Sequence, residues 1–300
     1  METDPSGRGQ TMKHLLLLFL ILGTAAPVFA DEYPHLFLGN PSNATEDKAK
    51  KENFLLKKEF FALSYNDTRR EANWVSWRTT KEDTIDKGDG GRKRTFSVDT
   101  SLPSAFYHVT HKDYAGFGFD RGHLCPHSDR VSSREASYST FVTTNIIPQT
   151  SDLNQKCWNT LEVYARDQVK KHANRRLYTI AGPAGKGGGP KDEPVEGIGL
   201  AGKIVVPAKC WKIIVIVDGD DDPDKDLEKI DDKTRVIAAI FPNETGLGLA
   251  WAKYRTSVAE VEKLTGLTFF DRVPEKVRKV LRETVDNVKI PAPKKASSED

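Results

Sequence analysis

The feature that most constrains the fold of this chain is the seven-residue run WKIIVIV at 211–217. Its short length and its β-branched side chains favour a buried strand over a helix. Similar runs at 54–65, 74–78, 177–180, 203–206 and 234–241 predict further strands. Helical patterns occur at 152–175, 257–265 and 274–288. Since no linker divides the chain, we predict one α+β domain over residues 31–290, with a central antiparallel sheet flanked by helices.

Residues 1–30 have the composition of a secretory signal peptide. Lys13 and His14 precede the apolar run LLLLFLILG at 15–23, and the small residue Ala30 follows it. This run is too short to span a bilayer, which needs about 20 apolar residues. A buried N-terminal helix is the alternative, but the pattern favours cleavage near Ala30. We therefore expect a secreted or periplasmic protein with no membrane segment in its mature form, and a disordered tail at 291–300.

The charge balance excludes proteins that bind nucleic acid through bulk positive charge. The chain of 300 residues carries 45 Lys and Arg against 43 Asp and Glu, a formal net charge of +2. This is unlike a histone or an acidic-tail protein. The three cysteines are too few for a disulfide scaffold, and their odd number leaves at least one unpaired within the chain.

Three polar segments stand out because folding alone does not require their residues: DRGH at 120–123, NIIPQ at 145–149 and NQKCWNTLE at 154–162, continuing to Arg166. Together they resemble the DNA/RNA non-specific endonucleases, a ββα-metal family. The signature of that family is D-R-G-H, then N-x-x-P-Q, then a helix with N-x-x-x-W-x-x-L-E-x-x-x-R. Flanking segments such as HLFLGNPSNA at 35–44 and NWVSW at 73–77 are similar to those of secreted nucleases of bacterial type. The resemblance covers about residues 33–275 and implies a ββα-metal active-site motif.

The chemistry of phosphodiester cleavage agrees with the residues that the resemblance assigns. A general base for water works best with a pKa near neutrality, as histidine has, and the resemblance gives this role to His123. Gly122 would leave the backbone free to aim the ring. Asn154 matches the residue that holds a single divalent ion, usually Mg²⁺, for which Mn²⁺ or another divalent ion may substitute. A neutral amide oxygen suits a hard cation that keeps most of its waters.

The resemblance also assigns supporting residues around this pair. Glu162, which matches a glutamate that holds the metal through water, follows Asn154 by eight residues, about 80° around an ideal helix. Asn145 matches an asparagine near the base, and Asp120 matches a residue that supports the site. Guanidinium groups suit phosphate oxygens, and three arginines match residues that contact phosphate in the family: Arg94, Arg121 and Arg166.

The resemblance implies a secreted, Mg²⁺-dependent endonuclease that hydrolyses single- and double-stranded DNA and RNA and leaves 5′-phosphate ends. Phosphate contacts carry no sequence information, so base preference should be low. One alternative is a non-catalytic nucleic-acid-binding protein on the same fold. Another is a zinc protein that uses His127 and Cys125, although Pro126 argues against the helix that such a site commonly uses. A dedicated protein inhibitor would leave no mark in this sequence.

The cysteines add one further expectation. If His123 and Asn154 face the same phosphate, Cys125 and Cys157 lie close to each other. The family usually has small residues at these two positions, and a secreted protein meets an oxidising environment. We therefore expect a Cys125–Cys157 disulfide with Cys210 free, and two buried thiols are the alternative.

Overall fold

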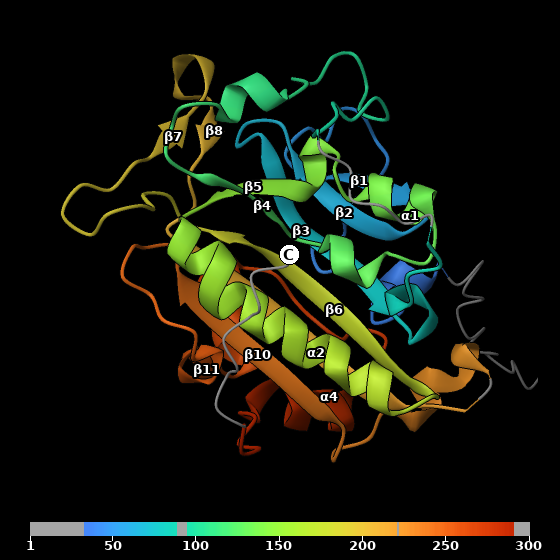
Figure 1. The fold of residues 1–300 in the computed structure, drawn as a ribbon. Coiled ribbons are helices and arrows are strands. Elements are labelled where there is room, and N and C mark those ends of the chain that lie inside the picture. Colours follow the sequence, from blue (N-terminus) through green and yellow to red (C-terminus); the bar gives the residue numbers. More distant parts are fainter. Residues whose placement is uncertain (1–32, 89–94, 221, 291–300) are drawn as a thin grey trace, which may run out of the picture. The chain divides into compact units, whose positions relative to one another are not determined.

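The computed structural model describes residues 33–88, 95–220 and 222–290, and a seven-stranded antiparallel sheet forms its centre (Figure 1). The strands follow the order β1-β2-β3-β6-β9-β10-β11, and every neighbouring pair is antiparallel. Their bounds are Phe54–Lys58, Phe61–Asn66, Glu71–Thr79, Arg175–Ala184, Lys209–Asp218, Arg235–Pro242 and Arg255–Thr256. The predicted α+β fold with a central antiparallel sheet is confirmed.

Two short two-stranded sheets and several helices surround this central sheet. Strand β4 (Asp120–His123) pairs with β5 (Ile146–Gln149), and β7 (Gly197–Ile198) pairs with β8 (Ile204–Val205). The helices are α1 (Arg134–Ser139), α2 (Asn159–Lys171), α3 (Val258–Thr265) and α4 (Glu275–Glu283), and a π-helical turn, Leu153–Trp158, leads into α2. In the described residues, no helix is long and apolar enough to cross a membrane.

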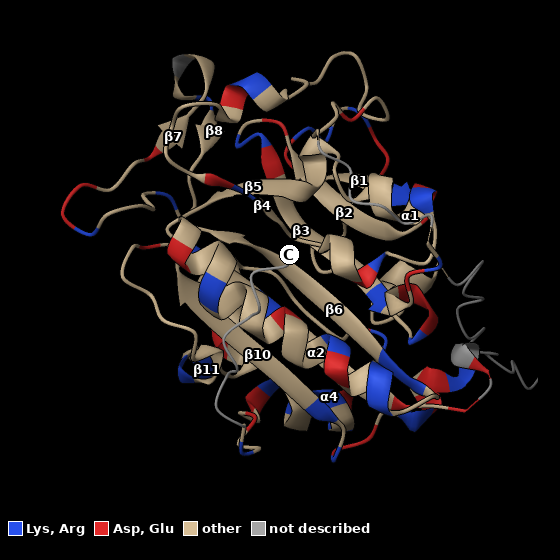
Figure 2. Ribbon diagram, viewed as in Figure 1, with Lys and Arg blue, Asp and Glu red and all other residues tan. Residues whose placement is uncertain are grey.

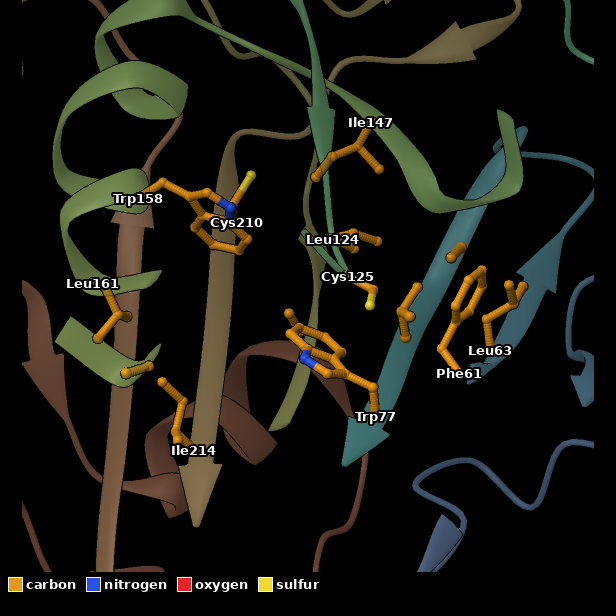
Figure 3. Packing of buried hydrophobic residues seen from close by; sticks show 14 of the residues in the cluster. Phe61, Leu63, Trp77, Leu124, Cys125, Ile147, Trp158, Leu161, Cys210 and Ile214 are labelled. Atoms are coloured by element: carbon orange, nitrogen blue, oxygen red, sulfur yellow. The ribbon is translucent and has the colours of Figure 1, made fainter. Parts of the chain in front are cut away.

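The run WKIIVIV is apolar on both faces because the sheet is covered on both faces. In β9 the side chains of Cys210 and Ile214 join the cluster that includes Leu161 of α2 (Figure 3). The alternate residue Ile213 packs in a second cluster with Val261 of α3. Because successive side chains of a strand point to opposite faces, a strand buried on both sides needs an almost unbroken apolar sequence.

The sequence was misread in two places that matter for the fold. The predicted strand at 54–65 is a hairpin, since β1 ends at Lys58 and β2 begins at Phe61. The buried Arg130 fixes the turn by donating from Nε and Nη2 to the carbonyl oxygen of Phe60, at 3.0 and 2.7 Å. The helix predicted over 152–175 is an α-helix only from Asn159 to Lys171. The predicted signal peptide and tail lie outside the described residues and stay predictions.

Candidate active site

The first motif forms a strand whose glycine is required by close packing. Strand β4 pairs with β5 so that Asp120 lies opposite Gln149 and His123 opposite Ile146. A Cβ on Gly122 would lie only 2.0 Å from Oε1 of the buried Gln149 side chain. Gly122 has ordinary strand backbone, so the expectation that it supplies backbone freedom is wrong. It leaves space for Gln149, and this links the first motif to the second.

His123 ends β4 with its ring against two aromatic side chains, Phe96 and Phe141, which also contact each other. The centroid of the half-buried ring lies 4.8 Å from that of Phe141, nearly perpendicular to it, and 5.4 Å from that of Phe96. Edge-to-face contacts of this kind favour a defined ring orientation. The structure therefore packs the predicted general base against an aromatic pair.

Asn145 clamps the chain that follows His123. Its buried amide donates from Nδ2 to the carbonyl oxygens of Cys125, at 2.8 Å, and Thr140, at 2.9 Å. Its Oδ1 accepts from the backbone N–H of Cys125 at 2.9 Å. These three bonds use the polar atoms of the amide on backbone groups. Asn145 thus acts on the position of the His123 segment, as a support for the general base.

Asp120 connects the strand that carries His123 with the predicted metal ligand. Its Oδ2 accepts from Nδ2 of Asn154 at 2.9 Å and from Nε2 of Gln155 at 2.8 Å, and its Oδ1 accepts from Oγ of Ser151 at 2.9 Å. The hydrogen bond from Nδ2 fixes the orientation of the Asn154 amide, so its Oδ1 can act as a ligand to a cation. The supporting role expected of Asp120 therefore has a clear geometric basis.

A π-helical turn carries Asn154 and changes its position relative to Glu162. The turn spans Leu153–Trp158, with Leu153, Cys157 and Trp158 buried against the sheet. The angle of about 80° between Asn154 and Glu162 assumed an unbroken α-helix, so that estimate does not describe this segment. Such π turns are frequent at functional sites because they re-aim side chains within a helix.

Glu162 forms a buried ion pair that the sequence analysis missed. Nζ of Lys212, on β9, lies 2.7 Å from Oε1 of Glu162, and their side chains are 1% and 11% exposed. Nζ also lies 4.0 Å from the ring centroid of Trp158. Burial raises the pKa of Glu162 above its usual value, while the positive charges of Lys212 and Arg166 act against this rise. The one charged residue in the WKIIVIV run is the signal that could have revealed this pair.

The three predicted arginines occupy different environments. Arg166 is buried, and its Nη1 lies 3.2 Å from Oδ1 of Asp129. Asp129 in turn accepts from Nε1 of Trp77 at 2.9 Å. Arg121 is exposed, with its guanidinium carbon 5.1 Å from the ring centroid of Phe96. Arg94 lies outside the described residues.

Asn243 is a second clamp that the sequence analysis did not identify. Its buried Oδ1 accepts from the backbone N–H of Thr150 at 2.8 Å. Its Nδ2 donates to the carbonyl oxygens of Pro148, at 3.0 Å, and Pro207, at 2.9 Å. Asn243 thus fixes the end of β5 and the residue that precedes the helical segment with Asn154. No local pattern marks it, since its partners are 36 to 95 residues away.

The predicted Cys125–Cys157 disulfide is wrong, because both cysteines are free and buried, whereas Cys210 is free as predicted. Cys125 and Cys157 belong to the same apolar cluster, and burial raises the pKa of each thiol. Figure 3 shows Cys125 and Cys210 within one apolar cluster. The alternative expectation, that Cys125 and Cys157 are two buried thiols, is confirmed.

The zinc alternative lacks a ligand set in the part of the chain that is described. No three or more His, Cys, Asp or Glu side chains of that part are grouped so that they could hold a metal ion. Cys125 is fully buried, and burial raises its pKa well above the usual range, which disfavours the thiolate that binds zinc. A Mg²⁺ site with a single amide ligand is a different kind of site, and the orientation of Asn154 fits it.

Comparison with known proteins identifies the family. The profile of the DNA/RNA non-specific endonucleases matches residues 38–276. The chain belongs to this family. A protein named Nuclease from Nostoc sp. is 40% identical over 253 residues, which cover 84% of this chain and 86% of that protein. Nuclease C1 from Cunninghamella echinulata is 31% identical over 79% of this chain and 88% of its own length.

The fold also agrees with that of a solved nuclease. The chain resembles the crystal structure of the EndoG/EndoGI complex with a TM-score of 0.64 at 24% identity, covering 81% of this chain and 92% of that one. The predicted ββα-metal architecture is thereby confirmed. The family and its named relatives establish that the chain is a non-specific DNA/RNA nuclease, an endonuclease that hydrolyses nucleic acid.

Proposed function

We propose that this nuclease is a secreted, Mg²⁺-dependent endonuclease that cleaves single- and double-stranded DNA and RNA and leaves 5′-phosphate ends. The observation that carries the proposal is the set of hydrogen bonds made by Asp120. Its carboxylate starts the strand that ends in His123 and also holds the amide of Asn154. A candidate general base and a candidate cation ligand are thus tied to one short strand.

The residues present support hydrolysis by water. His123 accepts a proton from water as the oxygen attacks phosphorus, the P–O3′ bond breaks, and the phosphate stays on the 5′ side of the next nucleotide. Asn154 would hold the divalent ion through Oδ1, and the bound ion would stabilise negative charge on the scissile phosphate and the leaving oxygen. Glu162, which is held by its ion pair with Lys212, would accept a hydrogen bond from a water molecule bound to this ion.

Arginine contacts with phosphate would account for the lack of sequence preference. The exposed Arg121 on the site strand can reach the nucleic-acid backbone, and Arg94 is proposed to do the same. Arg166 is buried against Asp129, so we assign it an electrostatic role beside Glu162. Phosphate recognition does not distinguish bases, and binding through it weakens as salt displaces the protein from the charged backbone.

Secretion and an inhibitor partner are further parts of the proposal. The apolar run at 15–23 and the small residues up to Ala30 support an export signal, which N-terminal sequencing of the exported protein would test. The similar structure is described as a complex that shows the mechanism of EndoG inhibition. By analogy, a protein inhibitor in the producing cell would protect its own nucleic acids.

The proposal is tested by time courses on plasmid, single-stranded DNA and RNA with Mg²⁺ or EDTA. We expect cleavage of all three polymers with Mg²⁺ and none with EDTA. Asn154→Ala should need more Mg²⁺ for half-maximal rate. Gln155→Ala, a neighbouring side chain that also bonds Asp120, should keep the wild-type Mg²⁺ requirement. Cleavage that persists in EDTA, or equal Mg²⁺ curves for both variants, would overturn the metal assignment.

A further inference from the structure

A cavity of about 500 Å³ opens beside the start of β4. It lies within the size range of small-molecule sites, about 300–1,000 Å³. Aromatic, aliphatic and acidic side chains line it, among them Phe117, Phe119, Ser151, Asp152, Glu193 and Val195. The mechanism proposed above uses none of the carboxylates or rings in this cavity.

The cavity adjoins Asp120, the residue that holds the amide of Asn154. Phe119 directly precedes Asp120, and Ser151, which lines the wall, donates from Oγ to Asp120 at 2.9 Å. The opposite wall is fixed as well, because the N–H of Gly189 donates to the carbonyl oxygen of Asn243 at 2.7 Å. A strand of nucleic acid bound at Asn154 and His123 would therefore pass close to this cavity.

Phe117 presents an aromatic face at the edge of the cavity. It is one of the large apolar side chains that stay exposed, at 44%. Gly116 and Gly118 on either side have φ values of +80° and +76°, a backbone conformation that glycine adopts without strain. Exposed rings beside a nucleic-acid path commonly serve as stacking surfaces, and stacking tolerates any base because every base has a π face.

The acidic side chains of the cavity favour the bases of a nucleic acid over its phosphates. Asp152 accepts at 2.5 Å from the backbone N–H of Gly246 and lies 2.5 Å from Nζ of Lys156. It brings carboxylate oxygens to the wall of the cavity, and Glu193 adds a second acidic group. Figure 2 shows acidic positions on the loop after β6 and at the beginning of the helical segment that leads into α2. Two carboxylates repel phosphate but accept hydrogen bonds from the amino groups of adenine, cytosine and guanine.

We propose that this cavity is a nucleobase subsite, which stacks one base of the substrate strand on Phe117 and accepts from its amino group. The proposal rests on the proposed nuclease function and adds a preference to it. Adenine, cytosine and guanine fit the cavity, whereas uracil and thymine lack the exocyclic amino group. The nuclease then cleaves without a defined sequence but with one position of modest base preference.

An end-labelled adenine-rich oligonucleotide with a single abasic residue tests the subsite. The wild-type enzyme should produce a cleavage ladder with a gap at a fixed offset from the abasic residue, at least about fivefold weaker than its neighbours, since one lost base–aromatic stack gives at least this effect. Replacing the abasic residue with thymine should give a weaker gap at the same offset. Phe117→Ala should give an even ladder, because no stack remains to be lost.

Two matched variants distinguish the loss of stacking on Phe117 from a general effect of changing an exposed aromatic side chain. Phe117→Tyr retains the ring and should keep the gap, and Tyr138→Ala removes another exposed aromatic side chain, on α1, and should also keep it. A wild-type ladder that is even around the abasic residue, or a gap that survives Phe117→Ala, would overturn the subsite. Failure of the wild-type enzyme to cut the intact oligonucleotide would instead contradict the proposed nuclease function.

Discussion

Replacing Lys212 with methionine should leave the carboxylate of Glu162 buried without its nearest cation. The side chains are 1% and 11% exposed, so water cannot take over the role of the ammonium group. Removing one member of a buried ion pair typically costs about 3–5 kcal/mol. Methionine retains most of the apolar volume of lysine, so the loss arises from charge more than from packing.

The loss of stability in Lys212→Met depends on pH, because Glu162 can bind a proton and so avoid a buried, unpaired negative charge. For a glutamate with an ordinary pKa of 4.5, protonation costs about 3.4 kcal/mol at pH 7 and about 0.7 kcal/mol at pH 5, at about 1.36 kcal/mol per pH unit. A folded-state pKa raised above the unfolded value gives stability at low pH that is lost as pH rises. We therefore expect Lys212→Met to lose about 3 kcal/mol at pH 7 and under about 1 kcal/mol at pH 5.

Urea unfolding at both pH values measures these losses, and plasmid nicking measures activity. The double variant Lys212→Met/Glu162→Gln should recover most of the stability at pH 7 but not the activity, because it removes the carboxylate. Lys209→Met, an exposed lysine of the same strand, is the control and should change stability by less than about 0.5 kcal/mol. An unchanged free energy of unfolding for Lys212→Met at pH 7, or equal losses at pH 5 and pH 7, would show that Lys212 does not stabilise the carboxylate of Glu162.

Three further results are expected. Burial raises the pKa of Glu71 to about 8, although Nη2 of Arg69 lies 2.6 Å from its Oε1. The free energy of unfolding of the wild-type protein should therefore fall as pH rises from about 4.5 through about 8. Glu71→Gln should reduce that fall in urea unfolding, and parallel pH curves for the two proteins would contradict this. Asn145→Ala leaves three buried backbone groups without their hydrogen bonds to this side chain, so it should lower the free energy of unfolding by about 2–4 kcal/mol. It should also lower kcat with little change in KM. An unchanged kcat would contradict the role of Asn145 in positioning His123. Thiol titration of denatured, unreduced protein should find three reactive thiols, and a single one would restore the disulfide.

The resemblance to a known family predicts the site residues, but the local sequence does not predict the strands that position them. The residue types of the three motifs suit phosphodiester hydrolysis, and their individual roles stay predictions. Strands β4 and β5 escaped prediction because each has four residues, with Gly122 in one and Pro148 in the other, and four residues carry no readable period. Their pairing depends on distant clamps such as Asn145 and Asn243.

Contacts between distant segments explain what the sequence could not reveal. Lys212 and Glu162 are 50 residues apart, so a lone charge within an apolar strand signals a buried partner but does not identify it. The expected disulfide failed because closeness in sequence to His123 and Asn154 does not fix the geometry of two side chains, and Cys125 and Cys157 stay free thiols within one apolar cluster. The π turn escaped prediction because the hydrophobic period alone does not distinguish it from an α-helix.

We propose His123 as the general base of this nuclease, with a divalent ion held by Asn154. The most direct test is the plasmid-nicking rate of His123→Ala at saturating Mg²⁺, with DNA affinity and unfolding measured on the same sample. Loss of a general base typically costs about 10²–10⁴ in rate, so we expect a loss in that range while DNA affinity and folding persist. A variant that folds and retains half of the wild-type rate would contradict the mechanism.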